Sequence, residues 1–262
     1  MNYQTLQVRY QASAPDGEDD ICFLTLYRPD ANNTINDQLV DECTQVIDHC
    51  YKRVKIIILE GLPEVFCFGA DFQGMADELA RQDAGAGQGP EPLYDLWHKL
   101  ATGPFVSVAH VRGKANAGGI GFVAACDLVL ADSPAEFSLS ELLFGLMPAC
   151  VLPFLIRRMG FQRAHALTLM TKPMKVKEAH EAGLVDAYAD NSEVLLRQHL
   201  SRLRRLNKTA IQRYKTYMNS LDDSLSSAKP KALAANLEVF TDSDNLQKIE
   251  RYVNTGRFPW ED

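Results

Sequence analysis

The sequence predicts an α/β fold in which a largely parallel sheet is covered by helices. Up to about residue 132, short β-rich runs alternate with helical patterns, and alternation of this kind favours a parallel sheet joined by right-handed crossovers. From about residue 151 onward the pattern is almost entirely helical. The chain has 262 residues, of which 46% are hydrophobic, so it is long enough for one large domain or two small ones with a sizeable core.

The strand patterns are short runs rich in Val, Ile, Leu, Phe and Tyr. The run VKIIILE is the most apolar of them and is typical of a strand covered on both faces. We expect strands at VRY near the start of the chain and over residues 20–27, 54–60, 105–111 and 128–132.

The helical patterns repeat apolar residues every three to four positions. The first is expected over residues 36–51, where five apolar side chains, from Leu39 to Cys50, share one face, and the next over 92–100. In the last third of the chain we expect helices over residues 193–206, 208–220 and 229–254. The Gly-, Ala- and Pro-rich segment 81–92 is predicted to be a mobile surface loop, and such loops often border a site.

Charge and composition exclude several classes of function. The net charge of −7 gives no basis for a nucleic-acid or membrane-surface role. The N-terminus lacks an apolar signal core and the apolar runs are too short to cross a bilayer, so we expect a cytoplasmic protein. The six cysteines form no CxxC pair and lie mostly in apolar segments, so buried reduced thiols are expected rather than metal ligands or disulfides. We expect neither a metal ion nor a cofactor.

The segment ANAGGIGFVAACD, residues 115–127, places three glycines after a strand and at the start of a helix. Their spacing matches neither the dinucleotide fingerprint nor the phosphate-binding loop. The free N–H groups of a helix N-terminus without side chains can bind an anionic oxygen. The alternative is that the glycines let this helix pack closely against the sheet.

A second strand followed by a glycine and a helix start occurs in FCFGADF, residues 66–72. The backbone N–H of Ala70 can converge with that of Gly118, and two such donors make an oxyanion hole. Asp71 directly follows Ala70, and it is a candidate catalytic acid or, alternatively, the cap of the next helix.

Glu141 lies in FSLSELLFGLMPA, a stretch that contains no other charged residue. Apolar neighbours raise the pKa of a carboxyl group and suit it to proton transfer. From this segment alone, a solvated glutamate is the ordinary interpretation. Glu141 becomes a catalytic candidate only in combination with the two glycine-containing turns.

These segments, in this order and spacing, resemble the crotonase (enoyl-CoA hydratase/isomerase) superfamily. The resemblance runs from RPDANNTIN through FCFGAD, HVRGKANAGGIGFVAACDLVLAD and FSLSELLFG to KEAHEAGLVD. It implies a core of repeated ββα units over residues 1–195, which holds a thioester, and a C-terminal helical region over 196–262 that helps to form a homotrimer, or a hexamer as a dimer of trimers.

The resemblance also implies roles for individual residues. Ala70 and Gly118 match the positions whose N–H groups bind the thioester oxygen and stabilise the enolate. Glu141 matches the second of the two glutamates that hydratases of this superfamily usually carry. The residues around the two turns are expected to contact the substrate: Phe68, Gly69, Asn116, Gly119 and Gly121.

The chain departs from the hydratase pattern at one position. The first glutamate usually stands three residues after the oxyanion-hole glycine, and this chain has Gly121 there. Hydration by two carboxylates is therefore not expected. A single carboxylate can serve a dehydration, because Glu141 can remove the α-proton and then protonate a departing β-hydroxyl on the same face.

Within the superfamily the chain looks most similar to the polyketide β-branching enoyl-CoA hydratase-like dehydratases. This similarity implies dehydration of 3-hydroxy-3-methylglutaryl-acyl carrier protein to 3-methylglutaconyl-acyl carrier protein, with the substrate carried on phosphopantetheine. The alternatives are decarboxylation of the 3-methylglutaconyl product, a conventional enoyl-CoA hydratase or isomerase, and a non-catalytic scaffold. The basic segment RLRRLNK, with Arg213 and Lys215, either docks the acidic carrier protein or is an exposed helix face with balanced salt bridges.

Overall fold

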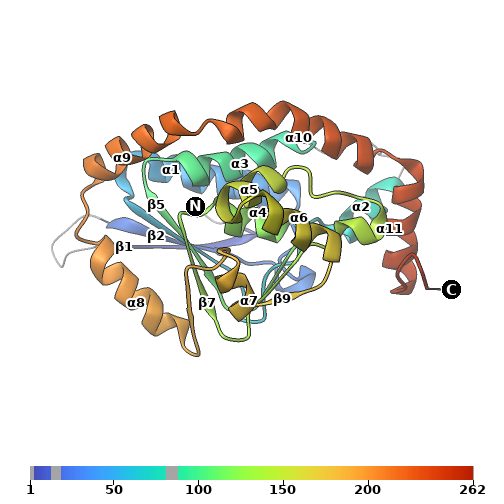
Figure 1. Ribbon diagram of the computed structural model, residues 1–262, viewed down its shortest axis with the longest axis horizontal. Helices are drawn as coiled ribbons and strands as arrows, with labels where there is room; N and C mark the ends of the chain where they lie inside the picture. The colour runs from blue at the N-terminus through green and yellow to red at the C-terminus, as the bar shows by residue number, and fades with distance from the viewer. Residues whose placement is uncertain (1–2, 13–18, 81–87, 262) are drawn as a thin grey trace.

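The computed structural model describes residues 3–12, 19–80 and 88–261. In this part of the chain, a six-stranded sheet crosses the centre of the molecule and helices cover it (Figure 1). The strand order is β1-β2-β3-β5-β7-β10; β1 and β2 are antiparallel and the other neighbours are parallel. The predicted fold class is confirmed. The strands are β1 Leu6–Ala12, β2 Asp19–Leu26, β3 Ile56–Glu60, β5 Val106–Val111, β7 Leu128–Asp132 and β10 Ala187–Ala189.

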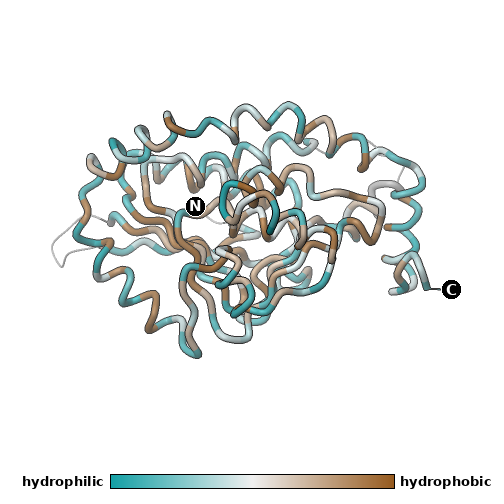
Figure 2. The backbone as a smooth tube through the Cα atoms, viewed as in Figure 1, coloured by the Kyte–Doolittle hydropathy of each residue, from teal (hydrophilic) through white to brown (hydrophobic). Residues whose placement is uncertain are grey.

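Both faces of the large sheet are buried, because successive side chains of a strand point to opposite faces. In β3, Ile57 and Leu59 pack in the main core, which also contains residues of α1 and α3. Ile56 and Ile58 belong to a second cluster. The helix α8 closes that cluster with Leu196 and Leu200. Figure 2 accordingly shows the most hydrophobic backbone in the central strands and hydrophilic segments on the outer helices.

A second, four-stranded sheet has the order β4-β6-β8-β9, and sequence analysis did not predict it. Its strands have two or three residues each, too few for a side-chain period to be visible. The chain turns into it at Gly61 and Gly113, where a Cβ atom would lie 2.4 Å from Phe66 Cα and 2.1 Å from Glu64 O, respectively. The strands are β4 Val65–Cys67, β6 Lys114–Asn116, β8 Glu136–Ser138 and β9 Met174–Lys175.

The two sheets and the helices follow one another in a repeated path. The chain runs β3–β4–α2, then β5–β6–α4, then β7–β8–η2, where η2 is a short 3-10 helix. This repeat confirms the expected ββα units, and it brings the starts of α2, α4 and η2 to the ends of three neighbouring short strands. The helices up to residue 181 are α1 Asp37–Arg53, α2 Phe72–Ala80, α3 Glu91–Thr102, α4 Gly118–Ala125, η2 Glu141–Phe144, α5 Leu152–Met159, α6 Phe161–Met170 and α7 Val176–Glu181, with the 3-10 turn η1 at Pro29–Ala31.

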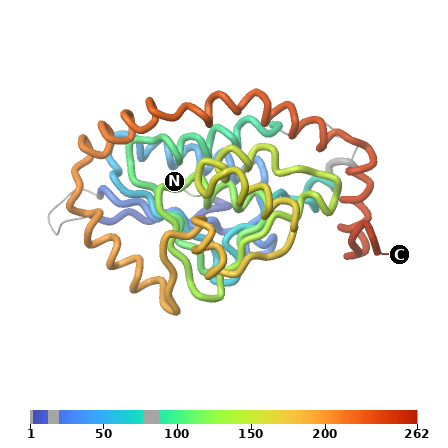
Figure 3. Tube along the Cα trace, viewed as in Figure 1, coloured from blue at the N-terminus to red at the C-terminus, as the bar shows by residue number. Residues whose placement is uncertain are grey.

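The C-terminal part is helical, as expected, and it runs along one side of the molecule before turning beside α2 (Figure 3). The single helix predicted over 229–254 was wrong, because the chain forms two helices there. The break is at Asp242, whose side chain accepts hydrogen bonds from the N–H groups of Asp244 and Asn245 and so starts a new helix. The helices are α8 Ser192–Leu203, α9 Lys208–Leu221, α10 Ser224–Phe240 and α11 Ser243–Thr255.

All six cysteines are buried and none forms a disulfide, which confirms the prediction of buried thiols. In the described ranges, no helix is both long enough and apolar enough to cross a membrane. Residues 81–87 of the predicted mobile loop lie outside the described residues.

Candidate active site

Two turns from different ββα units meet at the edge of the small sheet. One is at Gly69 and Ala70, between β4 and α2, and the other is at Ala117 and Gly118, between β6 and α4. Gly69 has φ of +92°, and a Cβ on it would lie 2.6 Å from the Cβ of Ala117 and 3.3 Å from the nitrogen of Gly118. A glycine is therefore needed at position 69 both for its backbone conformation and for this close approach.

Each turn presents a backbone N–H group that its own element does not use. Ala70 pairs with Ile35 in an isolated bridge, whose hydrogen bonds run from Ile35 N to Gly69 O at 2.7 Å and from Asp71 N to Ile35 O at 3.1 Å. These bonds leave out the nitrogen of Ala70. Gly118 is the first residue of α4, so its N–H has no acceptor within the helix. The structure brings the two predicted donors together, and their binding of a thioester oxygen stays a prediction.

The turn before α4 carries backbone strain. Ala117 has φ of 50° and ψ of −122°, a conformation that side-chain-bearing residues rarely adopt. Strain of this kind costs about 1–3 kcal/mol and persists only where neighbouring contacts impose it. Here the N–H of Ala117 donates to Ser138 O at 3.0 Å, which ties the turn to β8. The strained residue sets the direction of the N–H of Gly118.

Glu141 is the first residue of η2, and its side chain is nearly out of contact with solvent. The residue is 8% exposed, and its Oε2 atom has no hydrogen-bond partner within the described residues. Burial raises the pKa of Glu141 to about 7, although hydrogen bonds from the backbone at Glu141 and Ser140 oppose the shift. A carboxyl group with this pKa can both accept and release a proton near neutral pH.

A chain of polar contacts links the α4 turn to η2. The Ser138 hydroxyl donates to Asn116 Oδ1 at 2.8 Å, and Asn116 Nδ2 donates to the Ser140 hydroxyl at 3.0 Å. Asn116 was predicted to contact substrate. In the structure its amide group is used inside the protein, where it holds the Gly118 turn and Glu141 in a fixed relation.

The contacts of Asp71 are those of a helix cap and an ion pair. Its Oδ1 atom accepts from the N–H of Gly74 at 3.1 Å in the first turn of α2, and its Oδ2 atom is 2.8 Å from Arg28 Nη2. Arg28 in turn donates to the hydroxyl of Thr34 at 3.1 Å. Both carboxylate oxygens are thus engaged, which favours the capping alternative, and a catalytic role of Asp71 stays a prediction.

The glycines that follow Gly118 are needed for close packing. A Cβ on Gly119 would lie 2.3 Å from the backbone oxygen of Cys67, which fixes α4 against β4. A Cβ on Gly121 would lie 2.4 Å from Cζ2 of Trp97. The position at which the resemblance to hydratases implies a first glutamate is therefore closed by an indole. Phe68 is 41% exposed beside the Gly69 turn.

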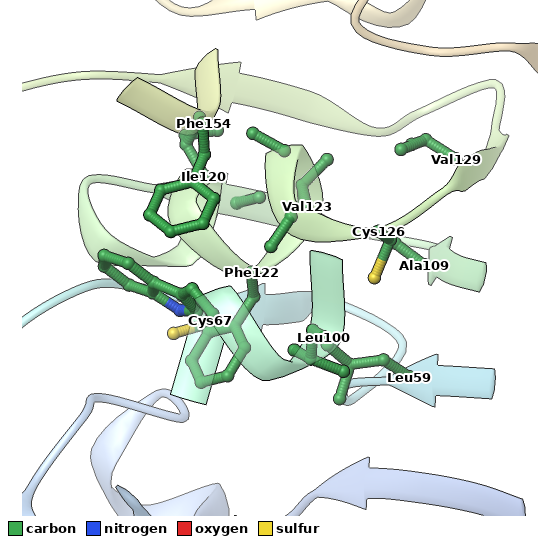
Figure 4. Packing of buried hydrophobic residues seen from close by; sticks show 14 of the residues in the cluster. Leu59, Cys67, Leu100, Ala109, Ile120, Phe122, Val123, Cys126, Val129 and Phe154 are labelled. Atoms are coloured by element: carbon green, nitrogen blue, oxygen red, sulfur yellow. The ribbon is translucent and has the colours of Figure 1, made fainter. Parts of the chain in front are cut away.

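Trp97 was missed by sequence analysis, where it was one apolar residue of a predicted helix. Its ring makes edge-to-face contacts with Phe122 and Phe154, both at 5.8 Å between centroids. Figure 4 shows Phe122 pointing from α4 toward Cys67, whereas Ile120 lies on the side of Phe154. The Nε1 atom of Trp97 is buried and has no hydrogen-bond partner in the described chain.

The C-terminal helix α11 covers η2 and α2, a contact that the sequence patterns did not predict. Phe144 of η2 packs against Phe72 at 5.5 Å and against Tyr252 at 5.1 Å between ring centroids. Asn245 donates through Nδ2 to Gly145 O at 3.1 Å, directly after η2. The segment that carries Glu141 is thus held from outside by α11.

The basic segment expected to dock a carrier protein is only partly available. Lys215 is buried in an ion pair with Asp127, and Lys208 donates to Val54 O at 2.6 Å. The exposed charges that remain are those of Arg202, Arg205 and Arg213. They lie around the loop between α8 and α9, at the end of the molecule away from α2 and α11 (Figure 1).

A separate buried polar cluster joins β3, β5 and α8. His110 contacts Glu60 Oε1 through Nδ1 at 2.8 Å and the Ser192 hydroxyl through Nε2 at 2.6 Å. A carboxylate oxygen of Glu193 lies within 4.8 Å of a ring nitrogen of His110 and an oxygen of Glu60, a grouping that can hold a metal ion. Both ring nitrogens of His110 are already engaged, and Arg112 lies 4.0 Å from Glu193. These contacts explain the cluster as a link between strands and helix.

Comparison with known proteins identifies the family. The enoyl-CoA hydratase/isomerase family matches residues 16–262. The chain belongs to this family. It is also 59% identical over 263 aligned positions, covering 100% of the chain and 98% of the relative, to the bacillaene synthase dehydratase PksH of Bacillus subtilis. A probable enoyl-CoA hydratase of Mycobacterium leprae is 32% identical over 68% of each chain.

Solved structures agree with this assignment. A crystal structure of a putative polyketide biosynthesis enoyl-CoA hydratase from Bacillus subtilis superposes with a TM-score of 0.93 at 58% identity, covering 98% of this chain and 100% of that one. An enoyl-CoA hydratase from Bacillus halodurans, 20% identical, superposes with a TM-score of 0.82 over 94% of this chain and 99% of that one, and it supports the fold alone. The resemblance stated from the sequence, to an enzyme family and to its polyketide members, is confirmed.

Proposed function

We propose that this protein is a dehydratase that converts 3-hydroxy-3-methylglutaryl-acyl carrier protein to 3-methylglutaconyl-acyl carrier protein. The observation that carries the proposal is the nearly buried carboxyl group of Glu141, whose Oε2 atom has no partner within the described residues, in a chain where Trp97 closes the position expected for the first hydratase glutamate, Gly121. The full-length similarity to a protein named as a bacillaene synthase dehydratase supports this class of reaction.

The first half of the reaction removes the α-proton of the thioester. The Glu141 carboxylate accepts this proton, and the electrons of the broken C–H bond move onto the thioester oxygen. The N–H groups of Ala70 and Gly118 stabilise the resulting enolate. A preorganised donor of this kind lowers the barrier of acyl-transfer reactions by about 3–4 kcal/mol.

The second half expels the β-hydroxyl group. The enolate returns its electrons, a double bond forms between the α- and β-carbons, and the carbon–oxygen bond to the hydroxyl breaks. Glu141, now protonated, gives its proton to the departing oxygen, so that water leaves and the carboxylate is regenerated. The pKa of about 7 suits both steps, because neither form of the carboxyl is strongly disfavoured near neutral pH. No cofactor is needed in this scheme.

The proposal is tested by incubating the purified protein with the hydroxymethylglutaryl-loaded carrier protein and following the mass of the acyl group. Loss of one water supports dehydration. An unchanged mass, together with loss of carbon dioxide from a methylglutaconyl-loaded carrier, would show a decarboxylase instead. Turnover of crotonyl-CoA in preference to both would show a conventional enoyl-CoA hydratase.

Glu136 offers a matched control for Glu141. It is also a glutamate of the β8–η2 region, but it pairs with Lys175 on the far edge of the small sheet. We expect Glu141→Gln to abolish the mass change and Glu136→Gln to keep it. Equal loss in both variants would point to a structural effect and would contradict the catalytic assignment.

We also propose that the protein is cytoplasmic and forms a homotrimer, or a hexamer as a dimer of trimers. Its proposed partner is an acyl carrier protein that carries the substrate. Arg205 and Arg213 are the residues to test, because Arg204 has a buried Nε atom and its backbone oxygen accepts from Lys55. Reversing both charges is expected to raise KM for the carrier-bound substrate and to leave the pantetheine-bound substrate unaffected. An equal effect on both substrates would exclude docking at this loop.

A further inference from the structure

Ser140 directly precedes Glu141 and occupies the N-cap position of η2. A serine at this position usually accepts a hydrogen bond from a backbone N–H group in the first turn of the helix. The side chain of Ser140 makes no such bond. Capping therefore does not account for this serine, and its hydroxyl group is free to make another contact.

The neighbouring hydrogen bonds leave the Ser140 hydroxyl group as a donor. Ser138 gives its single hydroxyl proton to Asn116 Oδ1 at 2.8 Å, and Asn116 Nδ2 donates to the Ser140 oxygen at 3.0 Å. The Ser140 oxygen thus accepts, while its own proton has no acceptor among the described residues. A hydroxyl group that accepts a hydrogen bond becomes a stronger donor in turn.

Ser140 lies beside the proposed acid and is partly exposed to solvent. Ala70 and Gly118, whose N–H groups form the proposed oxyanion hole, are partly exposed as well. The carboxyl group of Glu141 accepts hydrogen bonds from the backbone at Ser140 and at Glu141 itself, so it is turned back toward Ser140. The acid and the hydroxyl donor are therefore neighbours, and Asn116 connects Ser140 to the Gly118 turn.

The proposed dehydration needs a second group at the β-oxygen. Negative charge develops on this oxygen while its bond to carbon breaks, and an aimed donor stabilises such charge. The resemblance to hydratases implies two acids at this stage, but Gly121 stands in the place of the first, and Trp97 fills the space beside it. Glu141 supplies the proton, which leaves the role of the second partner open.

We propose that Ser140 is a further catalytic residue, whose hydroxyl group donates a hydrogen bond to the β-oxygen of the substrate as that oxygen leaves. The inference rests on the proposed dehydratase function. The Ser140 proton stays on Ser140. Glu141 transfers its own proton to the departing oxygen, the electrons of the enolate form the new double bond, and the oxygen leaves as water.

The two halves of the reaction separate this role from a structural one. Ser140→Ala should slow the loss of water from 3-hydroxy-3-methylglutaryl-pantetheine by about 10²-fold, as expected for removal of one donor from a developing oxyanion. Deuterium exchange at the α-carbon of 3-methylglutaryl-pantetheine, which has no β-hydroxyl group, should stay within about twofold. Mass spectrometry measures both rates. An equal fall in the two rates would show that Ser140 only supports Glu141, and it would overturn the proposal.

Three further variants complete the comparison. Ser140→Thr keeps the hydroxyl group and should keep both rates within about threefold. Ser133→Ala removes a serine hydroxyl that donates to Asp190 outside the site, and it should change neither rate. If Ser140→Ala does not fold, Ser140→Cys replaces it, because a thiol is a weak donor and should show the same selective loss of elimination. Elimination at the original rate in folded Ser140→Ala or Ser140→Cys would refute the proposal.

A binding measurement tests the contact without turnover. In Glu141→Gln, 3-hydroxy-3-methylglutaryl-pantetheine should bind about fivefold more tightly than 3-methylglutaryl-pantetheine, which lacks only the β-hydroxyl group. Adding Ser140→Ala should remove this preference. A preference that is absent from the single variant, or that persists in the double variant, would overturn the contact. If the unmodified protein releases no water from the carrier-bound substrate, the proposed function fails, whereas the binding preference still decides the role of Ser140.

Discussion

Two buried polar clusters in this chain use similar side chains in opposite ways. Around His110, the carboxylate of Glu60, both imidazole nitrogens and the hydroxyl of Ser192 all have partners at 2.6–2.8 Å. At Glu141, one carboxyl oxygen has no partner in the described residues. The Glu60, His110 and Ser192 side chains resemble the catalytic triad of a hydrolase. However, Ser192 is 1% exposed, so it cannot contact a substrate. The pairing around His110 indicates a structural cluster, whereas the unpaired oxygen of Glu141 is consistent with the catalytic role proposed for it.

The two glutamates also titrate in opposite directions. Burial raises the pKa of Glu141, and few hydrogen bonds oppose it. Burial also acts to raise the pKa of Glu60, but the hydrogen bond from His110 and the nearby positive charges outweigh it and leave this pKa lowered. Environment, rather than residue type, decides which acid is charged at neutral pH.

The largest expected effect is the loss of activity on substitution of Glu141, which the His110 cluster should not share. Glu141→Gln should slow deuterium exchange at the α-carbon by about 10³-fold, because it removes the base, and general acid–base catalysis contributes about 10²–10⁴ in rate. The measurement is mass spectrometry of a thioester incubated in D₂O. Comparable exchange rates in the variant and the unmodified protein would remove Glu141 from the mechanism.

The pH dependence of stability should have opposite signs for Glu141 and Glu60. The pKa of Glu141 is raised from 4.5 to about 7, so the folded chain binds more protons than the unfolded chain between these pH values. Its contribution to the free energy of unfolding is therefore present below pH 4.5 and falls as pH rises to 7, by on the order of 3 kcal/mol. Denaturant unfolding at pH 5 and pH 7.5 should show this decrease in the unmodified protein and not in Glu141→Gln. The rate of α-proton exchange should rise over the same range, as the base form appears.

Glu60 should behave in the opposite sense. Its pKa is lowered, so its contribution to stability is present above the ordinary value of 4.5 and is lost as pH falls below it. A variant without the His110 contact should therefore lose less stability on acidification than the unmodified protein. If the free energy of unfolding fell equally with pH in both proteins, the His110 cluster would not determine the loss of stability at acidic pH.

Breaking the paired cluster should cost stability and leave the chemistry intact. His110→Phe leaves Glu60 and Ser192 without their partner, and each orphaned buried group costs about 1–3 kcal/mol. Thermal unfolding measures this cost, while kcat per folded molecule should stay within about twofold. A large loss of kcat in a folded variant would mean that the cluster takes part in the reaction.

The smallest effect concerns the remaining catalytic candidate. Asp71→Asn should lower stability by about 1 kcal/mol, because it weakens the cap of α2 and the contact with Arg28. Its activity should fall far less than that of Glu141→Gln, as followed in the same exchange assay. A loss of the same size as in Glu141→Gln would give Asp71 a catalytic role after all.

The parts of the fold that sequence patterns predicted are those in which the information is local. The apolar run VKIIILE and the helical spacing of apolar residues from Leu39 to Cys50 are local signals, and the strand and the helix that they predict are both present. Of the short strands of the small sheet, only the one in FCFGADF was predicted; the other three, of two or three residues each, are shorter than any recognisable period. The break at Asp242 was missed because the helical spacing continues across it.

In the candidate site, too, the residues within local motifs were predictable and those brought in by tertiary packing were not. Ala70, Gly118 and Glu141 were predicted because each lies in a short motif of the family. Trp97 and α11 are separated from those motifs in the chain and meet them only in the folded molecule. A better signal for Trp97 was available in principle, since Gly121 implied that some other side chain occupies the acid's place. The packing of α3 on α4 determines which side chain fills the space at Gly121, and no local sequence pattern predicts that packing.

The cover formed by α11 has a consequence for the order in which the site is made. Asn245 and its acceptor Gly145 are 100 residues apart in sequence, so the ribosome completes both turns and η2 well before it reaches α11. A nascent chain of that length already carries Ala70, Gly118 and Glu141 but leaves the ring of Phe144 uncovered. The cover over η2 and α2 is therefore added late in synthesis, and a chain that ends before α11 lacks this cover but still contains every proposed catalytic residue.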